Sequence, residues 1–317
     1  MFIVDAHEDI AYHMSEFKRD FVSPDTPCQL TLPWLRDGGV RLAFNTVFIH
    51  PKHKPLYSRR EGVKQLDIYD SIYSSHPETV MRVGDLADLN TLIDSEKIGL
   101  FTLMEGADPL ESPRELDYFH ERGVRAVSLS WNDQNKYASG HNTDDALSSD
   151  GKELLHVMNE LKILLDLSHL NETGFWEAIE MTDFTPIATH SNARGLREHP
   201  RNLRDSQIKA IAERGGVVGV VFYGPFLRSG AHATIADIVS HIDYIASLVG
   251  EDHVGIGTDL DGAAPEAFPS EIKTIADVPK IAELLFDYGC SEDTVGKIMG
   301  GNFLRVIREH LEKSDKG

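Results

Sequence analysis

The sequence predicts an α/β fold, a single (β/α)₈ TIM barrel with extra C-terminal helices. Eight short apolar segments alternate with longer segments that have the periodicity of amphipathic helices. Most of the short segments are nearly continuous apolar runs, which is typical of parallel strands buried on both faces. The main alternative is an open, doubly wound sheet. Its nucleotide-binding version is disfavoured because the sequence has neither a GxGxxG motif after the first strand nor a Walker A motif.

The expected strands lie, in chain order, at residues 2–6, 40–49, 99–104, 124–131, 163–168, 186–189, 216–222 and 254–258. The clearest expected helix covers residues 233–249, where six apolar side chains share one face: Ile235, Ile238, Val239, Ile242, Ile245 and Ala246. Helical patterns at 281–286 and 303–311 follow the last strand, with a turn at Gly300-Gly301-Asn302 between them. No Pro/Gly/Ser-rich linker divides the 317 residues, so we expect one domain over residues 1–317.

Composition and charge exclude several classes of protein. Lys and Arg number 31 and Asp and Glu 51, and the resulting net charge of −20 argues against binding to nucleic acid or anionic membranes. Cys28 and Cys290 are the only cysteines, so neither a disulfide scaffold nor a cysteine zinc site is expected. We see no signal peptide and no apolar run long enough to span a membrane, and we expect a cytoplasmic protein.

Polar residues follow several of the expected strands. The chemistry of barrel enzymes lies at the C-terminal ends of the strands, and here five strands end in histidines or carboxylates: His7, Asp9, Glu105, His169, His190, Asp259 and Asp261. Carboxylates gathered at one place resist ionisation because they repel one another, and divalent cations remove that penalty. Imidazole and carboxylate ligands without thiolates suit Zn²⁺, Mn²⁺ or Co²⁺. The pattern therefore predicts a site for one or two metal ions.

Side-chain alternation narrows the ligand set at the first strand. Successive side chains of a strand point to opposite faces, so His7 and Asp9 share one side and Glu8 takes the other. We therefore leave Glu8 out of the expected ligands.

Together, these residues resemble the membrane (renal) dipeptidase family of zinc metallopeptidases, which are amidohydrolase-like barrels. The matching motifs run in the family's order over almost the whole chain: Asp5-Ala6-His7-Glu8-Asp9, Met104-Glu105-Gly106, Asp166-Leu167-Ser168-His169, Thr189-His190-Ser191-Asn192-Ala193-Arg194, His199-Pro200-Arg201-Asn202, and the segments 254–262 and 300–306.

The resemblance implies a role for each matching residue. His7 and Asp9 would bind one divalent ion, His169 and His190 a second, and Glu105 would bridge the two ions, which are expected to be Zn²⁺. Asp259, rather than Asp261, would be the catalytic acid/base, and Arg201 would grip the substrate's terminal carboxylate. The implied reaction is hydrolysis of dipeptides, including those with a C-terminal D-residue, by a metal-bridging hydroxide. The family also implies a homodimer.

The sequence departs from the family pattern at one position. Trp131 stands where many members have a histidine that contacts the substrate and polarises its carbonyl. An indole can donate one hydrogen bond but cannot transfer a proton. Trp131 and Asn132 are therefore candidate substrate contacts, with Asn135 and Tyr137 as further candidates. His141 lies in a loop that could reach the mouth of the barrel, but a substrate role is not its favoured interpretation.

Two other functions remain open from the sequence. Because Trp131 departs from the family pattern, the chain could instead be an amidohydrolase-type enzyme that acts on N-acyl amino acids, lactams or cyclic amides. A metal-binding barrel that has lost catalysis is less favoured, because Asp259 is present.

Overall fold

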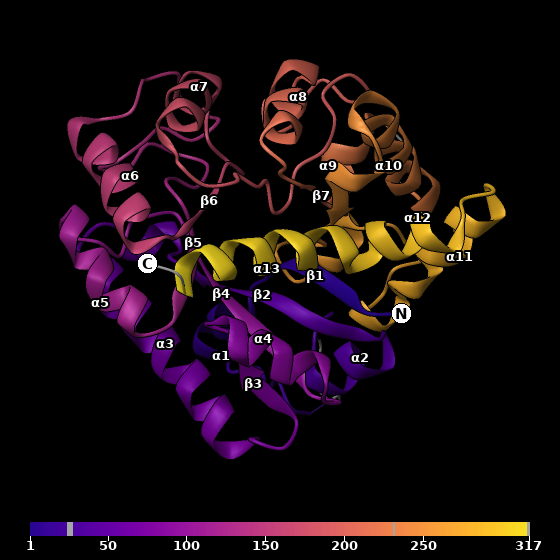
Figure 1. Cartoon of the computed structure of the whole chain (residues 1–317), viewed down its shortest axis with the longest axis horizontal. Helices are drawn as coiled ribbons and strands as arrows, with labels where there is room; N and C mark the ends of the chain where they lie inside the picture. Colours follow the sequence, from indigo (N-terminus) through magenta and orange to yellow (C-terminus); the bar gives the residue numbers. More distant parts are fainter. Residues whose placement is uncertain (24–27, 231, 316–317) are drawn as a thin grey trace.

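The computed structural model describes residues 1–23, 28–230 and 232–315, and it has the α/β barrel fold that the sequence predicts (Figure 1). The strands are β1 (Ile3–Glu8), β2 (Val40–Phe48), β3 (Val80–Arg82), β4 (Ile98–Glu105), β5 (Val124–Ser128), β6 (Leu164–Asp166), β7 (Val218–Val220) and β8 (Val254–Ile256).

The helices lie between the strands along the chain and after the last one. They are α1 (Ile10–Phe17), α2 (Leu32–Asp37), α3 (Ser58–Ser75), α4 (Leu86–Ile93), α5 (Leu116–Glu121), α6 (Ser149–Leu161), α7 (Glu172–Met181), α8 (Asp205–Glu213), α9 (Gly224–Leu227), α10 (Ile235–Val249), α11 (Pro279–Asp287), α12 (Glu292–Gly296) and α13 (Asn302–Asp315). Short 3₁₀ helices cover Pro51–His53, Pro113–Glu115, Glu251–His253, Pro265–Ala267 and Ile275–Asp277, and a π-helical turn covers Lys297–Gly301.

The strands form a curled parallel sheet. The order β1-β2-β4-β5-β6 is continuous, and β7 pairs with β8. Two parallel bridges join these parts, from Asp166 to Ile187 and from Ala188 to Val218. On the other side, Asp5 Oδ1 in β1 accepts a hydrogen bond of 2.8 Å from the backbone N–H of Thr258, just after β8. The C-terminal ends of the strands thus surround one opening of the barrel.

Two details of the predicted strands were wrong. The segment 186–189 forms single bridges instead of a ladder, because each of its paired residues contacts a different neighbour. Residues 80–82, which were not predicted, form β3 against the first residues of β4. Three residues are too few to produce a recognisable apolar run, so the strand depends on its partner rather than on its own sequence.

The first strand also departs from strict alternation. Asp5 pairs with Ala43 and Glu8 with Asn45, so β1 has one more residue than β2 between the two pairs. Such a bulge re-aims side chains locally. Even so, His7 and Asp9 lie at the same site, as predicted, whereas Glu8 is fully buried and joins no group of ligand atoms among the described residues.

Helix α13 closes the end of the barrel opposite the polar strand ends. Its apolar residues Phe303, Val306, Ile307 and Leu311 pack with side chains of β1, β2 and β4 inside the barrel. The Phe303 and Phe44 rings are 5.7 Å apart, and Figure 1 shows α13 crossing over the strands. Chemistry is therefore confined to the other end.

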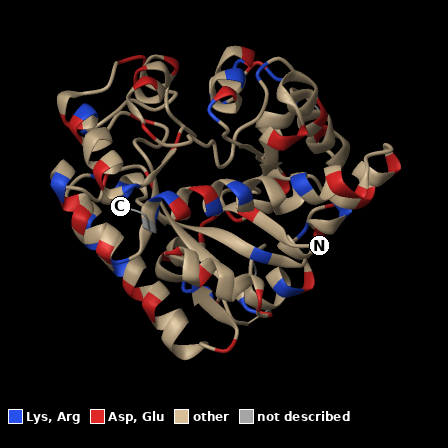
Figure 2. Cartoon of the chain, in the orientation of Figure 1, with Lys and Arg blue, Asp and Glu red and all other residues tan. Residues whose placement is uncertain are grey.

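Charge is distributed over the outer helices. Figure 2 shows Lys and Arg interspersed with Asp and Glu along α3 and α13. In the part of the chain that the structure describes, no helix is both long and apolar enough to cross a membrane.

The glycine pair before α13 allows the helix to approach β1. A Cβ atom on Gly300 would lie 2.3 Å from the carbonyl oxygen of Phe2 and 2.8 Å from the backbone nitrogen of Val4. Any side chain there would push α13 away from the strand. The predicted turn at Gly300-Gly301-Asn302 is part of a π-helical turn that ends at Gly301.

We expect Gly300→Ala to destabilise the protein by about 1–3 kcal/mol, the usual cost of overpacking. Gly296→Ala is the matched control, because a Cβ atom there meets nothing within 4 Å and alanine favours helix. Thermal unfolding of the two variants measures the difference. Equal melting temperatures would contradict the close approach at Gly300.

Candidate metal centre and active site

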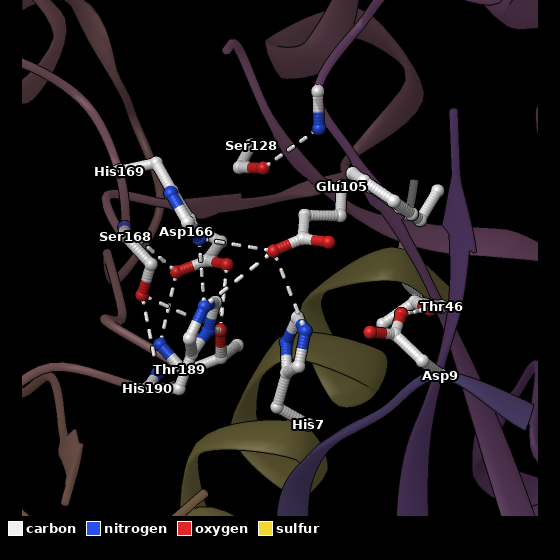
Figure 3. Close-up of polar contacts among 12 residues, drawn as sticks. His7, Asp9, Thr46, Glu105, Ser128, Asp166, Ser168, His169, Thr189 and His190 are labelled. Carbon is white, nitrogen blue, oxygen red and sulfur yellow. Dashed lines mark hydrogen bonds and ion pairs between the residues drawn. The ribbon is translucent and has the colours of Figure 1, made fainter. Parts of the chain in front are cut away.

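The five predicted ligands lie together at the C-terminal end of the barrel (Figure 3). His7 belongs to β1 and Glu105 ends β4, whereas Asp9, His169 and His190 follow their strands directly or after a short turn. All five side chains are buried. Glu105 Oε1 lies 3.0–3.4 Å from an Nε2 atom of each of three histidines: His7, His169 and His190. One carboxylate oxygen thus faces imidazoles from three segments of the chain.

The donor atoms fit divalent metal ions. The ligand atoms of His7, Glu105 and His190 lie within 4.8 Å of one another, and so do those of His7, Asp9 and Asp259. Neither ring nitrogen of His7 makes a hydrogen bond within the described structure, although both are buried. Buried imidazole nitrogens that converge with carboxylate oxygens, without thiolates, are the ligand set of Zn²⁺ and similar ions.

Burial and mutual charge dominate the electrostatics of these groups. Burial raises the pKa of Asp9 to about 6 and that of Asp259 to about 7. Burial opposes a charge on His7, but the neighbouring Glu105 carboxylate outweighs it and raises the pKa of His7 to about 10. For Glu105, burial opposes ionisation, but the charge of His7 and the close approach of the His169 and His7 rings lower the pKa overall. A bound cation would supply the positive charge that these carboxylates require.

Further polar residues hold the histidine rings. Asn132 Oδ1 lies 2.7 Å from His169 Nδ1, and Thr189 Oγ1 lies 2.8 Å from His190 Nδ1. These contacts at Nδ1 leave each Nε2 directed at Glu105. Such supporting contacts fix the orientation of ligand rings and tune their basicity. Asn132, which was predicted to contact substrate, thus also orients His169.

Sequence reasoning missed two supporting residues, Asp166 and Thr46. Asp166 accepts hydrogen bonds from the backbone N–H groups of Ser168 and Thr189 and from the Thr189 hydroxyl, at 2.7–3.0 Å. Thr46 donates its hydroxyl to Asp9 Oδ1, and Figure 3 shows the pair beside His7. The only signal in the sequence was the position of Asp166 inside a matching motif. Nothing marked Thr46, which comes from the middle of an apolar strand.

The structure separates the two aspartates after β8. Asp259 lines the main cavity and groups with His7 and Asp9. Asp261 instead accepts hydrogen bonds from Arg19 Nη1, at 2.8 Å, and from the backbone of Gln29, at 2.9 Å. Asp259, Asp261 and His169 all have positive φ angles, of 58°, 68° and 70°. Such strained backbone conformations cluster at functional sites, where the surrounding structure must hold them.

A cavity of about 610 Å³ opens beside these residues. Asp9, Glu105, His169 and Asp259 are among its lining residues, together with the aromatic side chains of Tyr12, Phe48, Trp131, Tyr223 and Phe226. The Trp131 ring is 5.2 Å from that of Phe48 and 6.0 Å from that of His169. Lys54 Nζ lies 5.6 Å from the centre of the Trp131 ring.

Arg201 lies behind His190 and lines a smaller cavity of about 190 Å³. Its Nη1 donates to Ser191 Oγ at 2.9 Å and its Nη2 to the carbonyl of His190 at 2.7 Å. The side chain is buried, and burial lowers its pKa to about 10, so it stays cationic at neutral pH. Within the described residues, no carboxylate forms an ion pair with it. A guanidinium has five N–H donors, so further donors remain after these two bonds.

A barrel whose strand ends gather buried imidazoles and carboxylates beside an open cavity defines a metal-dependent hydrolase. Comparison with known proteins is more specific. The sequence profile of membrane dipeptidase (peptidase family M19) matches residues 1–316. The chain therefore belongs to the membrane dipeptidase family, as its motifs predicted, and the class of enzyme is metallodipeptidase.

Individual proteins are similar to the chain over most of its length. The chain is 35% identical to an uncharacterised protein in the pqqA 5′ region of Klebsiella pneumoniae, over 70% of this chain and 86% of that protein. It is 27% identical to the dipeptidase aclJ of Aspergillus oryzae, over 98% of this chain and 79% of that protein. A metallo peptidase from Rhodobacter sphaeroides, solved with a phosphinate mimic of L-Ala-D-Ala, has the same fold with a TM-score of 0.90 at 24% identity, over 97% of this chain and 98% of that one.

We expect Zn²⁺ to raise the melting temperature of the metal-free protein more at about pH 7.5 than at about pH 5.5. The folded pKa values of Asp9 and Asp259 are raised, so without a cation these carboxyls cost stability as the pH rises above their ordinary value of 3.8. A cation removes that cost and competes with their protons. Asp259→Asn should weaken the pH dependence, whereas the control Asp261→Asn should keep it. Equal zinc shifts at both pH values would contradict this assignment.

Proposed function

We propose that this chain hydrolyses the peptide bond of dipeptides at a binuclear metal centre, including dipeptides with a C-terminal D-residue. The observation that carries the proposal is the position of Glu105, whose carboxylate faces three buried histidines at 3.0–3.4 Å. Membership of the membrane dipeptidase family supports the substrate class. The Rhodobacter relative solved with a mimic of L-Ala-D-Ala supports tolerance of a D-residue.

Two ligand sets fit around Glu105. His7 and Asp9 would hold one ion, His169 and His190 the other, with Glu105 between them. The 2.8 Å separation of the Nε2 atoms of His169 and His190 supports their binding of a common ion. We take both ions to be Zn²⁺, because the donors are imidazoles and carboxylates only. When bound, such a pair of ions lowers the pKa of a bound water toward neutrality, and the ions also polarise the scissile carbonyl.

Asp259 would move the proton. It lies at the cavity, close to His7 and Asp9. An acid/base works best when its pKa is near the working pH, and burial raises the pKa of Asp259 to about 7. The carboxyl would accept a proton from the attacking water and pass it to the leaving amine.

Arg201 would bind the terminal carboxylate of the substrate. It is a buried guanidinium without a carboxylate partner in the described structure, and buried charges are stable only when compensated. Trp131 and Asn132 line the main cavity and would contact the rest of the dipeptide. A homodimer, a cytoplasmic location and a single domain over residues 1–317 remain predictions from the sequence.

One observation supports a second candidate function. Trp131 widens the apolar wall of the cavity, next to Phe48. A structure described as an amidohydrolase from Pseudomonas aeruginosa is 27% identical to the chain, with a TM-score of 0.83 over 98% of this chain and 97% of that one. The second candidate is therefore hydrolysis of N-acyl amino acids, lactams or cyclic amides.

Metal analysis and a dipeptide library test the proposal together. We expect about two equivalents of metal per chain and hydrolysis of dipeptides such as L-Ala–D-Ala, compared directly with L-Ala–L-Ala. Two equivalents of metal without turnover of any dipeptide would favour the second candidate. Protein that binds no metal after reconstitution would overturn both.

We expect Asp259→Asn to lower kcat by about 10²- to 10⁴-fold, the usual contribution of an acid/base, with metal still bound. The control is Asp261→Asn, which changes the same chemical group two positions away on a side chain held by Arg19 and Gln29. Turnover and metal content of both variants are measured. Near-full turnover of Asp259→Asn would rule out the assigned role.

A further inference from the structure

One histidine outside the proposed ligands lies between the two cavities. His141 lines both the 610 Å³ cavity beside Glu105 and the 190 Å³ cavity beside Arg201. Its ring centre is 6.1 Å from that of His169 and 6.2 Å from that of His199. The two rings are in contact, so His141 directly borders the proposed ligand His169 at the cavity wall. From the sequence, a substrate role for His141 is possible but is not the favoured interpretation.

The loop that carries His141 is held on both sides. Gly140, before it, forms an antiparallel bridge with Leu170, the residue after His169. A Cβ atom on Gly140 would lie 1.8 Å from the carbonyl oxygen of Trp131, so only glycine allows this approach. After it, the N–H of Asn142 donates to the carbonyl of Asn132 at 3.0 Å. The position of His141 relative to Trp131 and His169 is therefore fixed before substrate binds.

The hydrogen-bonding capacity of His141 is unused. Its Nδ1 atom is buried and has no hydrogen-bond partner in the described structure. Buried polar atoms are normally paired, so an unpaired one at a cavity wall indicates a partner that arrives with a ligand. Trp131, on the neighbouring wall, offers a single indole N–H and no acceptor.

The charges around His141 select an anion. Arg201 lines the same small cavity and forms no ion pair with a carboxylate of the described residues. Two carboxylates also line this cavity: Glu172, which is paired with Arg204 at 2.8 Å, and Asp144, which is exposed. Burial, and then the charge of Arg201, lower the pKa of His141 to about 4. An imidazole ring provides an N–H donor in either protonation state. A guanidinium and an imidazole N–H facing one cavity suit a carboxylate.

We propose that His141 is a substrate-binding residue that donates a hydrogen bond to the terminal carboxylate of the dipeptide, beside Arg201. This inference rests on the proposed dipeptidase function. It narrows the ligand to short peptides with a free C-terminal carboxylate. With a tryptophan at position 131, the polar contact to the substrate would instead come from the loop that follows, which packs closely against Trp131 at Gly140.

The test compares a dipeptide with its own C-terminal amide. A hydrogen bond to a charged group corresponds to about 10- to 100-fold in affinity. We therefore expect His141→Ala to raise KM for the free dipeptide by about that factor, with little change in kcat. The amide, measured as a substrate or, if uncleaved, as a competitive inhibitor, should bind wild type and variant alike. His141→Asn, which keeps a donor, should recover part of the loss.

Exposed His156 on α6 provides the control, since His156→Ala should leave KM and kcat unchanged. Metal content and melting temperature establish that each variant is folded. Equal weakening of the acid and the amide by His141→Ala, or no weakening of either, would overturn the inference alone. A wild-type enzyme that cleaves no dipeptide would instead overturn the proposed function, and this inference with it.

Discussion

The buried carboxylate of Glu105 is the group around which the strand ends are organised. One of its oxygens faces imidazoles from three separate segments of the chain at 3.0–3.4 Å. Burial opposes its charge, and the positive charge of His7 and the close approach of the His169 ring sustain it. An ionised carboxylate at this depth is stable only with such compensation. The ends of β1, β4 and β6 and the segment at 187–190 must therefore meet at one point.

Two aspartates hold neighbouring strand ends together at the places where the sheet has no continuous ladder. Asp5 accepts hydrogen bonds from the backbone N–H of His7, two residues on, and from that of Thr258 across the β1–β8 seam. Asp166 does the same with Ser168, two residues on, and with Thr189 across the neighbouring seam. A proposed metal ligand follows each seam directly, His7 after the first and His190 after the second. At these two seams, side-chain carboxylates thus join segments whose backbones do not form a continuous ladder.

The two ends of the barrel divide stability from chemistry. At one end, α13 fills the interior with apolar side chains and approaches β1 as closely as Gly300 allows. At the other end, the loops surround an aromatic-walled cavity above the polar strand ends. This arrangement is general for barrel enzymes, and here it leaves the loops after β5 and β6 free to determine which substrate groups are contacted. The bridge between Gly140 and Leu170 couples these two loops directly.

Several features could be predicted from the sequence because they depend on local patterns. Apolar runs identified most of the strands, and motifs at their ends identified the buried imidazoles and carboxylates. Predictions failed where a segment depends on its partner, as in β3 and in residues 186–189. Strand alternation placed Glu8 apart from His7 and Asp9, and in the described structure Glu8 joins neither group of ligand atoms, even though a bulge interrupts the alternation.

Other features required the folded chain. Asp259 and Asp261 are both strand-end carboxylates, and in the sequence only the resemblance to the family distinguishes them. In the structure, Asp261 accepts hydrogen bonds from Arg19 and Gln29, whereas Asp259 lines the cavity. Asn132 and His141 likewise take their positions from bonds to residues about 30 to 40 positions away. The sequence by itself determined the fold class, the family and the chemical types of the ligand residues, because periodicity and motif are properties of neighbouring residues. Only the tertiary structure decided which side chains reach the cavity, because that depends on contacts between segments distant along the chain.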